Sequence, residues 1–246
     1  MKEIFRKIKR KWKKILLHPI HVFVVHNVSA SYSSFQGPKE DWISVNDFQQ
    51  SIIKLQRIYT FISLEEALEH LKHDVIRLKD FAVLTADDGY HSVYEQLPWL
   101  INNNVPITLF INPKYLDGKS YSEHIWRFVH NAHPEISEAV FVKDRYMSVS
   151  ELHSIVSPLV SIGSHGYEHI DNAQMNDEEF NADIDKTFDE INLSHSVIPF
   201  HAYPFGKYSA GNEKVLKEKE ICPLLADGWY NINDATKIHR EYLPKI

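Results

Sequence analysis

The sequence predicts a single-domain α/β fold whose parallel strands form either a barrel or a doubly wound sheet. Short, almost wholly apolar runs alternate along the chain with amphipathic stretches of helical spacing, and polar residues follow directly after several of the apolar runs. A length of 246 residues with 43% hydrophobic residues provides for one sizeable core. No internal repeat, low-complexity tract or clear linker divides the chain.

Six runs are expected to be buried strands, because each is short, nearly all apolar and bounded by turn residues. They are residues 21–26, 81–86, 106–111, 159–165, 197–203 and 221–226. Apolar residues repeat every three to four positions between these runs, which predicts helices at 44–58, 63–73, 148–156 and 176–193. Ser148 with Glu151, and Asn176 with Glu179, have the spacing of a capping box at a helix start. The segment 113–147 is the least regular and is interpreted as an insertion.

The first 20 residues differ from the rest in charge. Residues 1–14 hold eight Lys/Arg and one Glu, a charge of +7, which leaves −13 for the remainder of a chain with net charge −6. Apolar residues recur among them at helical spacing, and a basic amphipathic helix of this kind can lie on an anionic membrane surface. The alternative is that the apolar stripe packs on the protein's own domain. We therefore divide the chain into a basic amphipathic segment, 1–20, and one main domain, 21–246.

Charge and cysteine content also bear on partners and location. Peripheral membrane contact is predicted through residues 1–16, whereas nucleic acid is not expected as a partner because the acidic body would repel a phosphate backbone. The single cysteine, Cys222, cannot form an internal disulfide and fits a reducing compartment. No apolar run approaches the ~20 residues of a membrane span. These features predict a cytoplasmic protein with peripheral contact at the membrane face.

Polar side chains gather where the predicted strands end. Asp87 and Asp88 follow 81–86, His165 and His169 follow the strand at 159–165, and His26 ends the first strand. The carboxyl ends of parallel strands share one rim, which is where such folds carry their active residues. Two adjacent carboxylates repel each other and need a cation, a proton or open solvent. A solvated Asp-Asp-Gly turn is the alternative interpretation.

The spacing of His165 and His169 suits a metal ion. Two imidazoles four residues apart can face one ion, and a nearby carboxylate completes a three-ligand set with an open position for water. With 15 histidines in the chain this spacing alone is weak, and two unconnected surface histidines are the alternative. The position after a predicted strand is what favours a metal site.

These residues resemble the polysaccharide deacetylase family. TADDGY (85–90) is similar to the family's first motif, Thr-Phe-Asp-Asp-Gly; SHGYEH (164–169) is similar to the second, His-Ser/Thr-x-x-His; and AYPFG (202–206) resembles one form of the third. The resemblance runs from about residue 21 to 240. It implies a distorted (β/α) barrel of about seven parallel strands. It also implies a metal-dependent hydrolase that removes an acetyl group from a sugar or polysaccharide precursor, in the biosynthesis of a surface polysaccharide.

The resemblance also implies a role for each site residue. Asp88, His165 and His169 would bind a divalent metal, with zinc as first choice and cobalt, nickel or iron also suited to the ligands. Asp87 would be the general base that activates a water. A backbone N–H near Tyr203 to Phe205 could complete an oxyanion site, and Tyr203 is assigned to the catalytic residues on that basis.

Three departures from the family pattern affect the assignment. Ala86 replaces the usual Phe, and Ala202 replaces the Arg that commonly orients the base, which leaves open how Asp87 is held. The last motif is at best TKIH (236–239), so the general acid is either His26 or His239. We prefer His26, because period-two alternation directs it to the rim with Val22 and Val24. A hydrogen-bonded structural histidine is the alternative for both.

Three functions agree with this pattern. The first is an active deacetylase, favoured because the base and all three ligands are present. The second is a carbohydrate-binding protein that has lost turnover, suggested by Ala86 and Ala202. The third is a related amide hydrolase such as a sugar deformylase. The sequence leaves open which sugar is bound and whether the acetyl group is on nitrogen or oxygen.

Overall fold

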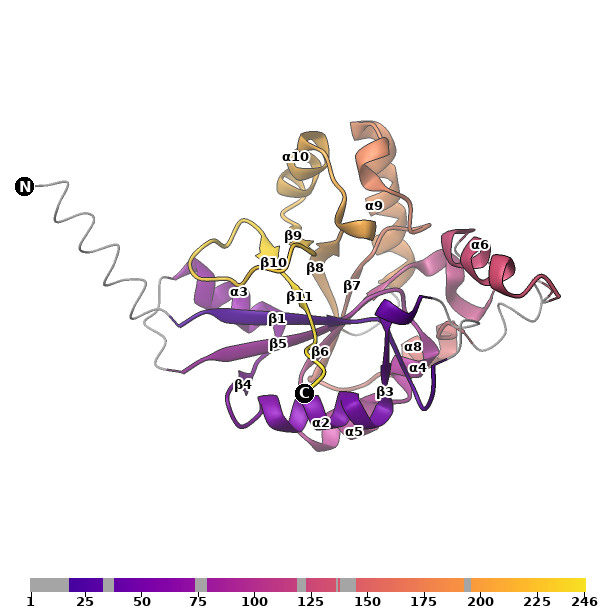
Figure 1. Ribbon diagram of the computed structural model, residues 1–246. Coiled ribbons are helices and arrows are strands. Elements are labelled where there is room, and N and C mark those ends of the chain that lie inside the picture. The colour runs from indigo at the N-terminus through magenta and orange to yellow at the C-terminus, as the bar shows by residue number, and fades with distance from the viewer. Residues whose placement is uncertain are drawn as a thin grey trace, which may run out of the picture.

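Parallel strands form the centre of the protein, which confirms the predicted fold class. The computed structural model describes residues 18–32, 38–73, 79–118, 123–135, 137, 145–192 and 196–246. All six predicted strands are present, with ends that differ by at most one residue from the expected ones. They are β1 (Ile20–Val25), β5 (Phe81–Ala86), β6 (Ile107–Ile111), β7 (Val160–Ser164), β8 (Val197–Ala202) and β9 (Cys222–Leu225). Figure 1 shows them side by side with helices packed around them.

The last strand segment closes the sheet into a barrel. The strand order is β10-β9-β8-β7-β6-β5-β1-β11, where β10 is Ile238–His239 and β11 is Glu241–Tyr242. One residue, Arg240, separates these two strands, so a single stretch of chain, residues 238–242, pairs with β9 on one side and with β1 on the other; we call this stretch the last strand. Among the described residues the path therefore holds eight strands, against an expected number of about seven, and β4 (Thr60–Phe61) adds a short pairing to β5.

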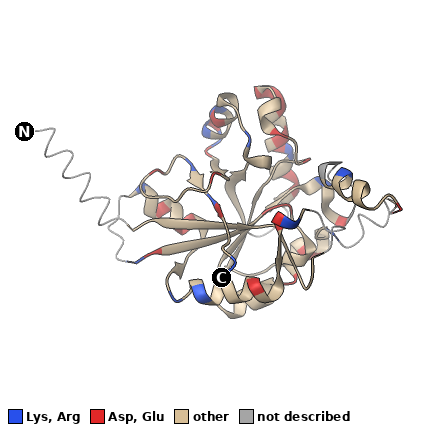
Figure 2. Cartoon of the chain, viewed as in Figure 1, with Lys and Arg blue, Asp and Glu red and all other residues tan. Residues whose placement is uncertain are grey.

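The four predicted helices are present, and capping explains where they begin. They are α2 (Val45–Leu55), α3 (Leu64–Lys72), α8 (Val149–Ser154) and α9 (Asp177–Ile191). Both predicted capping boxes are confirmed, at Ser148–Glu151 and Asn176–Glu179. Figure 2 marks acidic residues along α9, whose buried residues are Phe180, Ile184, Thr187 and Ile191.

Several short elements were not predicted from the sequence. They are α4 (His91–Tyr94), α5 (Leu97–Asn102), α6 (Glu123–Ala132), α10 (Ala210–Glu218), β2 (Asn27–Ser29), β3 (Trp42–Ser44) and the short η2 (Lys39–Asp41), η3 (Pro113–Gly118), η4 (Asn172–Gln174) and η5 (Pro204–Gly206). The expected insertion at 113–147 is described in part and contributes η3 and α6. The predicted basic helix at 1–16 lies outside the described residues.

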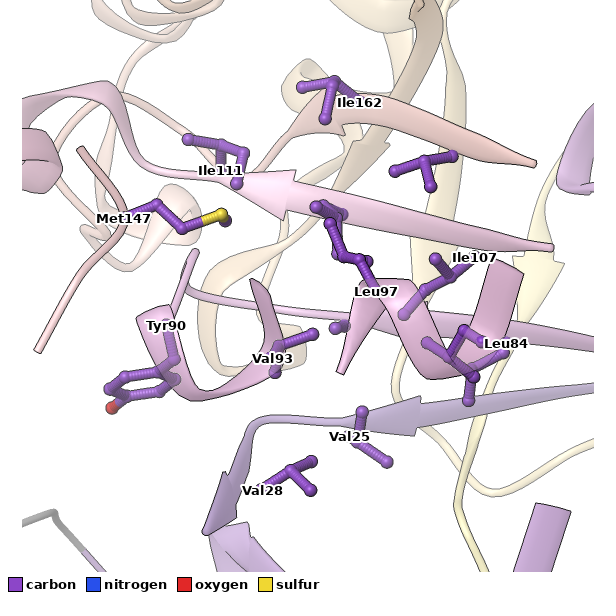
Figure 3. Packing of buried hydrophobic residues seen from close by; sticks show 14 of the residues in the cluster. Val25, Val28, Leu84, Tyr90, Val93, Leu97, Ile107, Ile111, Met147 and Ile162 are labelled. Carbon is purple, nitrogen blue, oxygen red and sulfur yellow. The ribbon is translucent and has the colours of Figure 1, made fainter. Parts of the chain in front are cut away.

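Apolar side chains fill both faces of the sheet. On the outer face, Leu84, Ile107 and Ile162 pack with Val93 and Leu97 from α4 and α5 in the largest buried cluster (Figure 3). A second cluster brings residues of β1, β5, β6, β8, β9 and β10 together. Within the part of the chain that is described, no helix is long and apolar enough to cross a membrane.

One glycine shows how tightly the barrel is packed. A Cβ at Gly163 in β7 would lie 2.5 Å from a ring carbon of Phe110 in β6, closer than side chains approach in practice. The missing side chain therefore makes room for the Phe110 ring, which is fully buried. The same ring lies 5.5 Å below the guanidinium of Arg240. Phe110 therefore contacts both the tightly packed barrel interior and Arg240.

Candidate active site

The two aspartates diverge at the end of β5. The Asp87 backbone N–H still donates to Val25 O at 3.1 Å, so Asp87 continues the pairing of the strand and follows Thr85 on the interior face. Asp88 (φ 69°) and Gly89 (φ 70°) then turn the chain in the left-handed region. This turn separates the carboxylates and directs them to different partners. Asp88 faces β7, whereas Asp87 faces β1 and the last strand.

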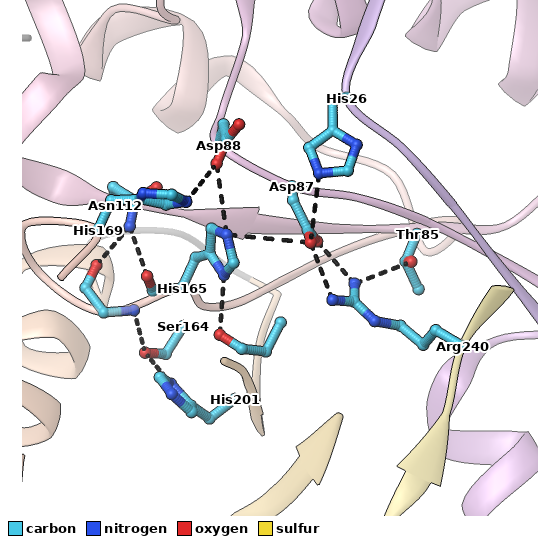
Figure 4. A network of polar contacts seen from close by, with 12 residues as sticks. His26, Thr85, Asp87, Asp88, Asn112, Ser164, His165, His169, His201 and Arg240 are labelled. Atoms are coloured by element: carbon cyan, nitrogen blue, oxygen red, sulfur yellow. Dashed lines mark hydrogen bonds and ion pairs between the residues drawn. The ribbon is translucent and has the colours of Figure 1, made fainter. Parts of the chain in front are cut away.

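Asp88, His165 and His169 converge at the rim as the sequence predicted. One ligand atom from each lies within 4.8 Å of the others, and Asp88 Oδ1 is 3.3 Å from His165 Nε2 and 3.2 Å from His169 Nε2 (Figure 4). Asp88 Oδ1 and His169 Nδ1 are buried without a hydrogen bond. Burial would raise the pKa of Asp88, but the two imidazoles hold it well below its usual value. An ionised carboxylate and two imidazole nitrogens are suitable donors for a divalent ion.

The loop that carries the two histidines is held from several sides. His165 Nδ1 donates to Ala202 O at 2.8 Å, which leaves Nε2 to face Asp88. The side-chain amide of Asn112, at the end of β6, donates to both His165 O and Gly166 O. The carboxylate of Asp183 in α9 accepts from the Tyr167 N–H at 3.1 Å. These bonds fix a segment in which His169 itself has a positive φ of 53°.

The buried side chain of His201 also holds the loop that carries His165 and His169. His201 accepts from Ser164 Oγ at 2.9 Å through Nδ1, and its Nε2 donates to Asn172 Oδ1 at 3.1 Å. Burial lowers the pKa of His201 well below its usual value, so the ring is neutral and can accept at one nitrogen and donate at the other. Ser164 precedes His165 and Asn172 follows the loop, and His201 therefore joins its two ends.

Asp87 is held by Arg240, which the sequence analysis did not identify. Arg240 Nη1 and Nη2 donate to the two carboxylate oxygens at 2.7 and 2.9 Å, and Nη1 lies 3.3 Å from Thr85 Oγ1 (Figure 4). Asp87 is 4% exposed and Arg240 is 1% exposed. Burial would raise the pKa of Asp87, but Arg240 and His165 lower it below its usual value. Arg240 thus answers the question that Ala202 raised, since the base is oriented from the last strand.

The alternation of the last strand was the signal that could have identified Arg240. Ile238 and Arg240 are buried, whereas His239 and Glu241 between and after them are partly exposed. A strand that directs an apolar residue and an arginine to the same buried face needs a carboxylate within the barrel. The same alternation places His239 on the outside, where its Nδ1 lies 2.6 Å from Asp227 Oδ2. His239 is therefore directed away from the rim.

His26 also lies beside Asp87 (Figure 4). Its Nε2 is 3.9 Å from Asp87 Oδ2, and its side chain is 16% exposed. The ring also lies beside Tyr242, with centroids 5.8 Å apart. Of the two histidines considered from the sequence, His26 is the one that borders both the site and solvent.

Tyr203 is not placed as the sequence analysis expected. Its ring is 1% exposed and lies among Phe180, His201 and Tyr208 in a third apolar cluster, with its hydroxyl buried and without a hydrogen bond. Its backbone N–H points to Leu224 O at 3.5 Å, within the β8–β9 pairing. Neither the side chain nor this N–H is directed at the site, because the pairing with β9 extends one residue past the end of β8, to Tyr203. Phe205 (φ 58°) instead brings its ring to 4.6 Å from His169.

The rim therefore combines a convergent Asp-His-His set, an ionised carboxylate clamped by an arginine, and a partly exposed imidazole. Hydrolytic sites in which a divalent ion and a carboxylate base act together contain these same groups. The polysaccharide deacetylase family matches residues 76–222, more than half of the chain. The protein belongs to this family and is a carbohydrate deacetylase.

Solved structures similar to this chain have the same fold. IcaB from Ammonifex degensii has a TM-score of 0.72 at 19% identity, with 92% of each chain covered. The deacetylase PplD of Streptococcus pyogenes, in complex with acetate, has a TM-score of 0.71 at 15% identity, with 93% of this chain and 94% of that chain covered. The deacetylase domain of BpsB from Bordetella bronchiseptica has a TM-score of 0.66 at 20% identity, covering 92% and 96%. A comparison with curated proteins gave no match.

Proposed function

We propose that this protein is a metal-dependent deacetylase that hydrolyses an acetyl group on a sugar unit of a surface polysaccharide or its precursor. The observation that carries the proposal is the pairing of Asp87 with Arg240 beside the convergent ligands Asp88, His165 and His169. Ala202 had suggested a carbohydrate-binding protein without turnover. Arg240 supports the enzyme instead, because it supplies from another strand the guanidinium that Ala202 lacks.

The residues divide the chemistry between two sides of the site. Asp88, His165 and His169 would hold the divalent ion, which when bound polarises an acyl carbonyl and lowers the pKa of a water. Asp87, ionised and oriented by Arg240, takes a proton from the attacking water. His26 donates a proton to the sugar nitrogen or oxygen as its bond to the acyl carbon breaks. Acetate and the free amine or hydroxyl are then released.

One carboxylate and two imidazoles suit zinc, which we propose as the metal, although cobalt, nickel and iron accept the same donors. The neighbouring aspartates provide matched variants for a test. Asp88→Asn should weaken binding of the ion, because it removes a charged ligand. Asp87→Asn should leave the ion bound and reduce acetate release about 10²-fold or more, because only the base is lost.

Both variants are tested by metal titration of the chelator-treated protein and by acetate release from acetylated oligosaccharides. Unchanged acetate release in Asp87→Asn would contradict the role of the base. Equal loss of metal in both variants would show instead that the two aspartates share ligation. Activity that survives full removal of metal would overturn the metal-dependent mechanism.

The charge of the first residues supports a location for this activity. We propose that residues 1–16, with their apolar stripe and excess of Lys and Arg, bring the enzyme to the cytoplasmic membrane face. Binding to anionic vesicles should weaken as salt is raised and should be lost when these residues are deleted. Equal vesicle binding by the shortened chain would contradict this part of the proposal.

A further inference from the structure

Two tyrosines from the segment between β6 and α8 lie between the groups that carry the proposed metal ligands. Asp88 is in the turn after β5, residues 88–90, and His169 is in the loop after β7, residues 165–170; we call these the Asp88 turn and the histidine loop. Because β6 lies between β5 and β7 in the sheet, the chain that leaves β6 passes between them. Tyr115 in η3 and Tyr146 before α8 are both buried here, with ring centroids 5.3 Å apart.

The Asp88 turn rests on the segment around Tyr146. Tyr90 and Tyr146 form an antiparallel bridge, and the Met147 N–H donates to Gly89 O at 3.0 Å. The rings of Tyr90 and Tyr146 are stacked, with centroids 5.5 Å apart and an interplanar angle of 12°. Stacked aromatic rings are stabilised beyond the burial of their surface. The position of the Asp88 turn is therefore tied to that of Tyr146.

Tyr115 holds the histidine loop in a different way. Its hydroxyl donates to Glu168 O at 2.5 Å, and Glu168 directly precedes His169. The neighbouring Lys114 adds a contact of its N–H with Tyr167 O at 3.4 Å and an ion pair with the Glu168 carboxylate. Both side chains of that ion pair are about one third exposed, so it is the weaker contact. Tyr115 thus fixes the backbone just before a ligand whose φ is 53°.

A small cavity shows that the two tyrosines border the ligands themselves. It has a volume of about 180 Å³, open solvent included, and its lining includes Tyr115, Tyr146, Asp88 and His169. The rings therefore form a wall beside the space between the two ligands. Asp88 Oδ1 and His169 Nε2 lie 3.2 Å apart across this space. A metal ion binds only where its ligands are held at set distances, so this wall bears directly on metal binding.

We propose that Tyr115 and Tyr146 are positioning residues that together form one link between the Asp88 turn and the histidine loop. The link runs from the turn to Tyr146, by ring contact to Tyr115, and by its hydroxyl to Glu168 O. It holds Asp88 and His169 at the separation that a metal ion requires. The inference rests on the proposed function, because it takes these two residues to be ligands. A link in series is lost as a whole when either of its contacts is broken.

Metal titration of the chelator-treated full chain with Zn²⁺ tests the link. Tyr115→Phe loses the bond to Glu168 O and keeps the ring, whereas Tyr146→Leu loses the ring contact and keeps an apolar side chain. Each should weaken Zn²⁺ binding about tenfold, as is typical when support of a ligand is lost. The double variant should also lose about tenfold, because the link is already broken in either single variant. Two independent supports would instead lose about a hundredfold.

Tyr94→Phe is the matched control. The Tyr94 hydroxyl lies 3.1 Å from Ser154 Oγ, so the change also removes one tyrosine hydrogen bond, but between α4 and α8. Its Zn²⁺ affinity should equal that of the wild type. The visible absorption of bound Co²⁺ reports the coordination of the ion, and it should change in Tyr115→Phe and not in the control. A role in packing alone would lower the free energy of unfolding and leave both metal readouts unchanged.

Hydrogen exchange of the metal-free proteins tests the link without the ion. Tyr146→Leu should raise deuterium uptake in residues 165–170 as Tyr115→Phe does, although the bond of Tyr115 to Glu168 O is not itself replaced. If the wild type binds no metal, the proposed function fails, and this measurement decides the link alone. Unchanged uptake in Tyr146→Leu would overturn the proposal. Wild-type Zn²⁺ affinity in both single variants, or a hundredfold loss in the double variant, would also overturn it.

Discussion

The site has two halves that are held in different ways: the ligand half, formed by Asp88, His165 and His169, and the base half, formed by Asp87 and Arg240. Asp88, His165 and His169 come from two short segments, and many separate hydrogen bonds fix the loop that carries the histidines. Among the described residues, the Asp87 carboxylate accepts hydrogen bonds from one side chain, Arg240, which comes from the far end of the chain. The ligand half should therefore tolerate the loss of one contact, whereas the base half should not.

The difference follows from how the barrel closes. Arg240 reaches Asp87 because β10 and β11 pair with β9 and β1 on either side of it. The base half is therefore complete only when the first and last strands meet. The ligand loop rests on neighbouring strands β6, β7 and β8, which form by successive pairing along the sheet. Stability and activity should be coupled in the base half and largely separable in the ligand half.

The largest effect is expected from breaking the base half. Arg240→Met removes the guanidinium and both of its hydrogen bonds to the buried Asp87 carboxylate, which should lower the free energy of unfolding by about 3–5 kcal/mol. Acetate release should fall about 10²-fold or more, because the base is no longer oriented. Urea unfolding of the metal-free protein measures the first effect and an acetate assay measures the second.

A double variant separates the two effects. Arg240→Met combined with Asp87→Asn removes the buried charge along with its partner, so it should recover most of the lost stability and remain inactive. A loss below about 1 kcal/mol in Arg240→Met would show that Asp87 finds another partner. The contrast between the two halves would then disappear.

A smaller effect is expected in the ligand half from Asn112→Asp. The change keeps the shape of the side chain but replaces the amide that donates to His165 O and Gly166 O with an acceptor. Loss of such supporting bonds typically weakens metal binding about 10–100-fold. Metal titration of the chelator-treated protein measures this loss. The other bonds to the loop remain, so the protein should fold and keep residual activity.

Asn212→Asp is the matched control. Asn212 is also fully buried, but it lies in α10, and its Oδ1 accepts from Ser209 N–H, a bond that an aspartate retains. Its metal affinity should equal that of the wild type. If Asn112→Asp binds metal as tightly as the control, Asn112 does not position the histidines. If it loses metal altogether, the ligand half is as dependent on one contact as the base half.

The sequence predicted the ligand half better than the base half because its signals are local. A run such as FAVLTA predicts a strand and its end, and the two histidines are four residues apart, so their convergence required only that β5 and β7 share a rim. Arg240 depends on barrel closure by two strands of two residues each, which are too short to give an apolar run. His26 was placed correctly by alternation along β1.

Tyr203 shows a different limit. A position at the end of a strand and a motif match both directed it to the site, but its ring instead fills the space between β8, α9 and α10. Which face of a strand end packs against a helix depends on side chains such as Phe180 and Tyr208, which are distant in the sequence. Local pattern therefore predicted the segment and not the direction of the side chain.

The smallest effect tests the support that α9 gives to the ligand loop. Burial raises the pKa of Asp183 from 3.8 to about 6. The folded state therefore binds this proton more tightly than the unfolded state, and the contribution of Asp183 to stability falls as pH rises from about 4 to 6. Asp183→Asn removes this penalty and keeps an oxygen for the Tyr167 N–H. The variant should therefore gain stability relative to wild type by about 1–2 kcal/mol between pH 4 and pH 7, allowing for partial exposure.

Urea unfolding of the metal-free proteins across this pH range measures that gain, and Asp189→Asn is the control. Asp189 is an exposed carboxylate on the same helix, and its replacement should change stability by no more than about 0.5 kcal/mol at any pH. A pH-independent difference between Asp183→Asn and wild type would contradict the argument. If Asp183→Asn also loses metal affinity, the charge of Asp183 supports the loop beyond its hydrogen bond. Metal binding by the ligand half would then depend on the charge of Asp183 in α9 as well as on its hydrogen bond to Tyr167.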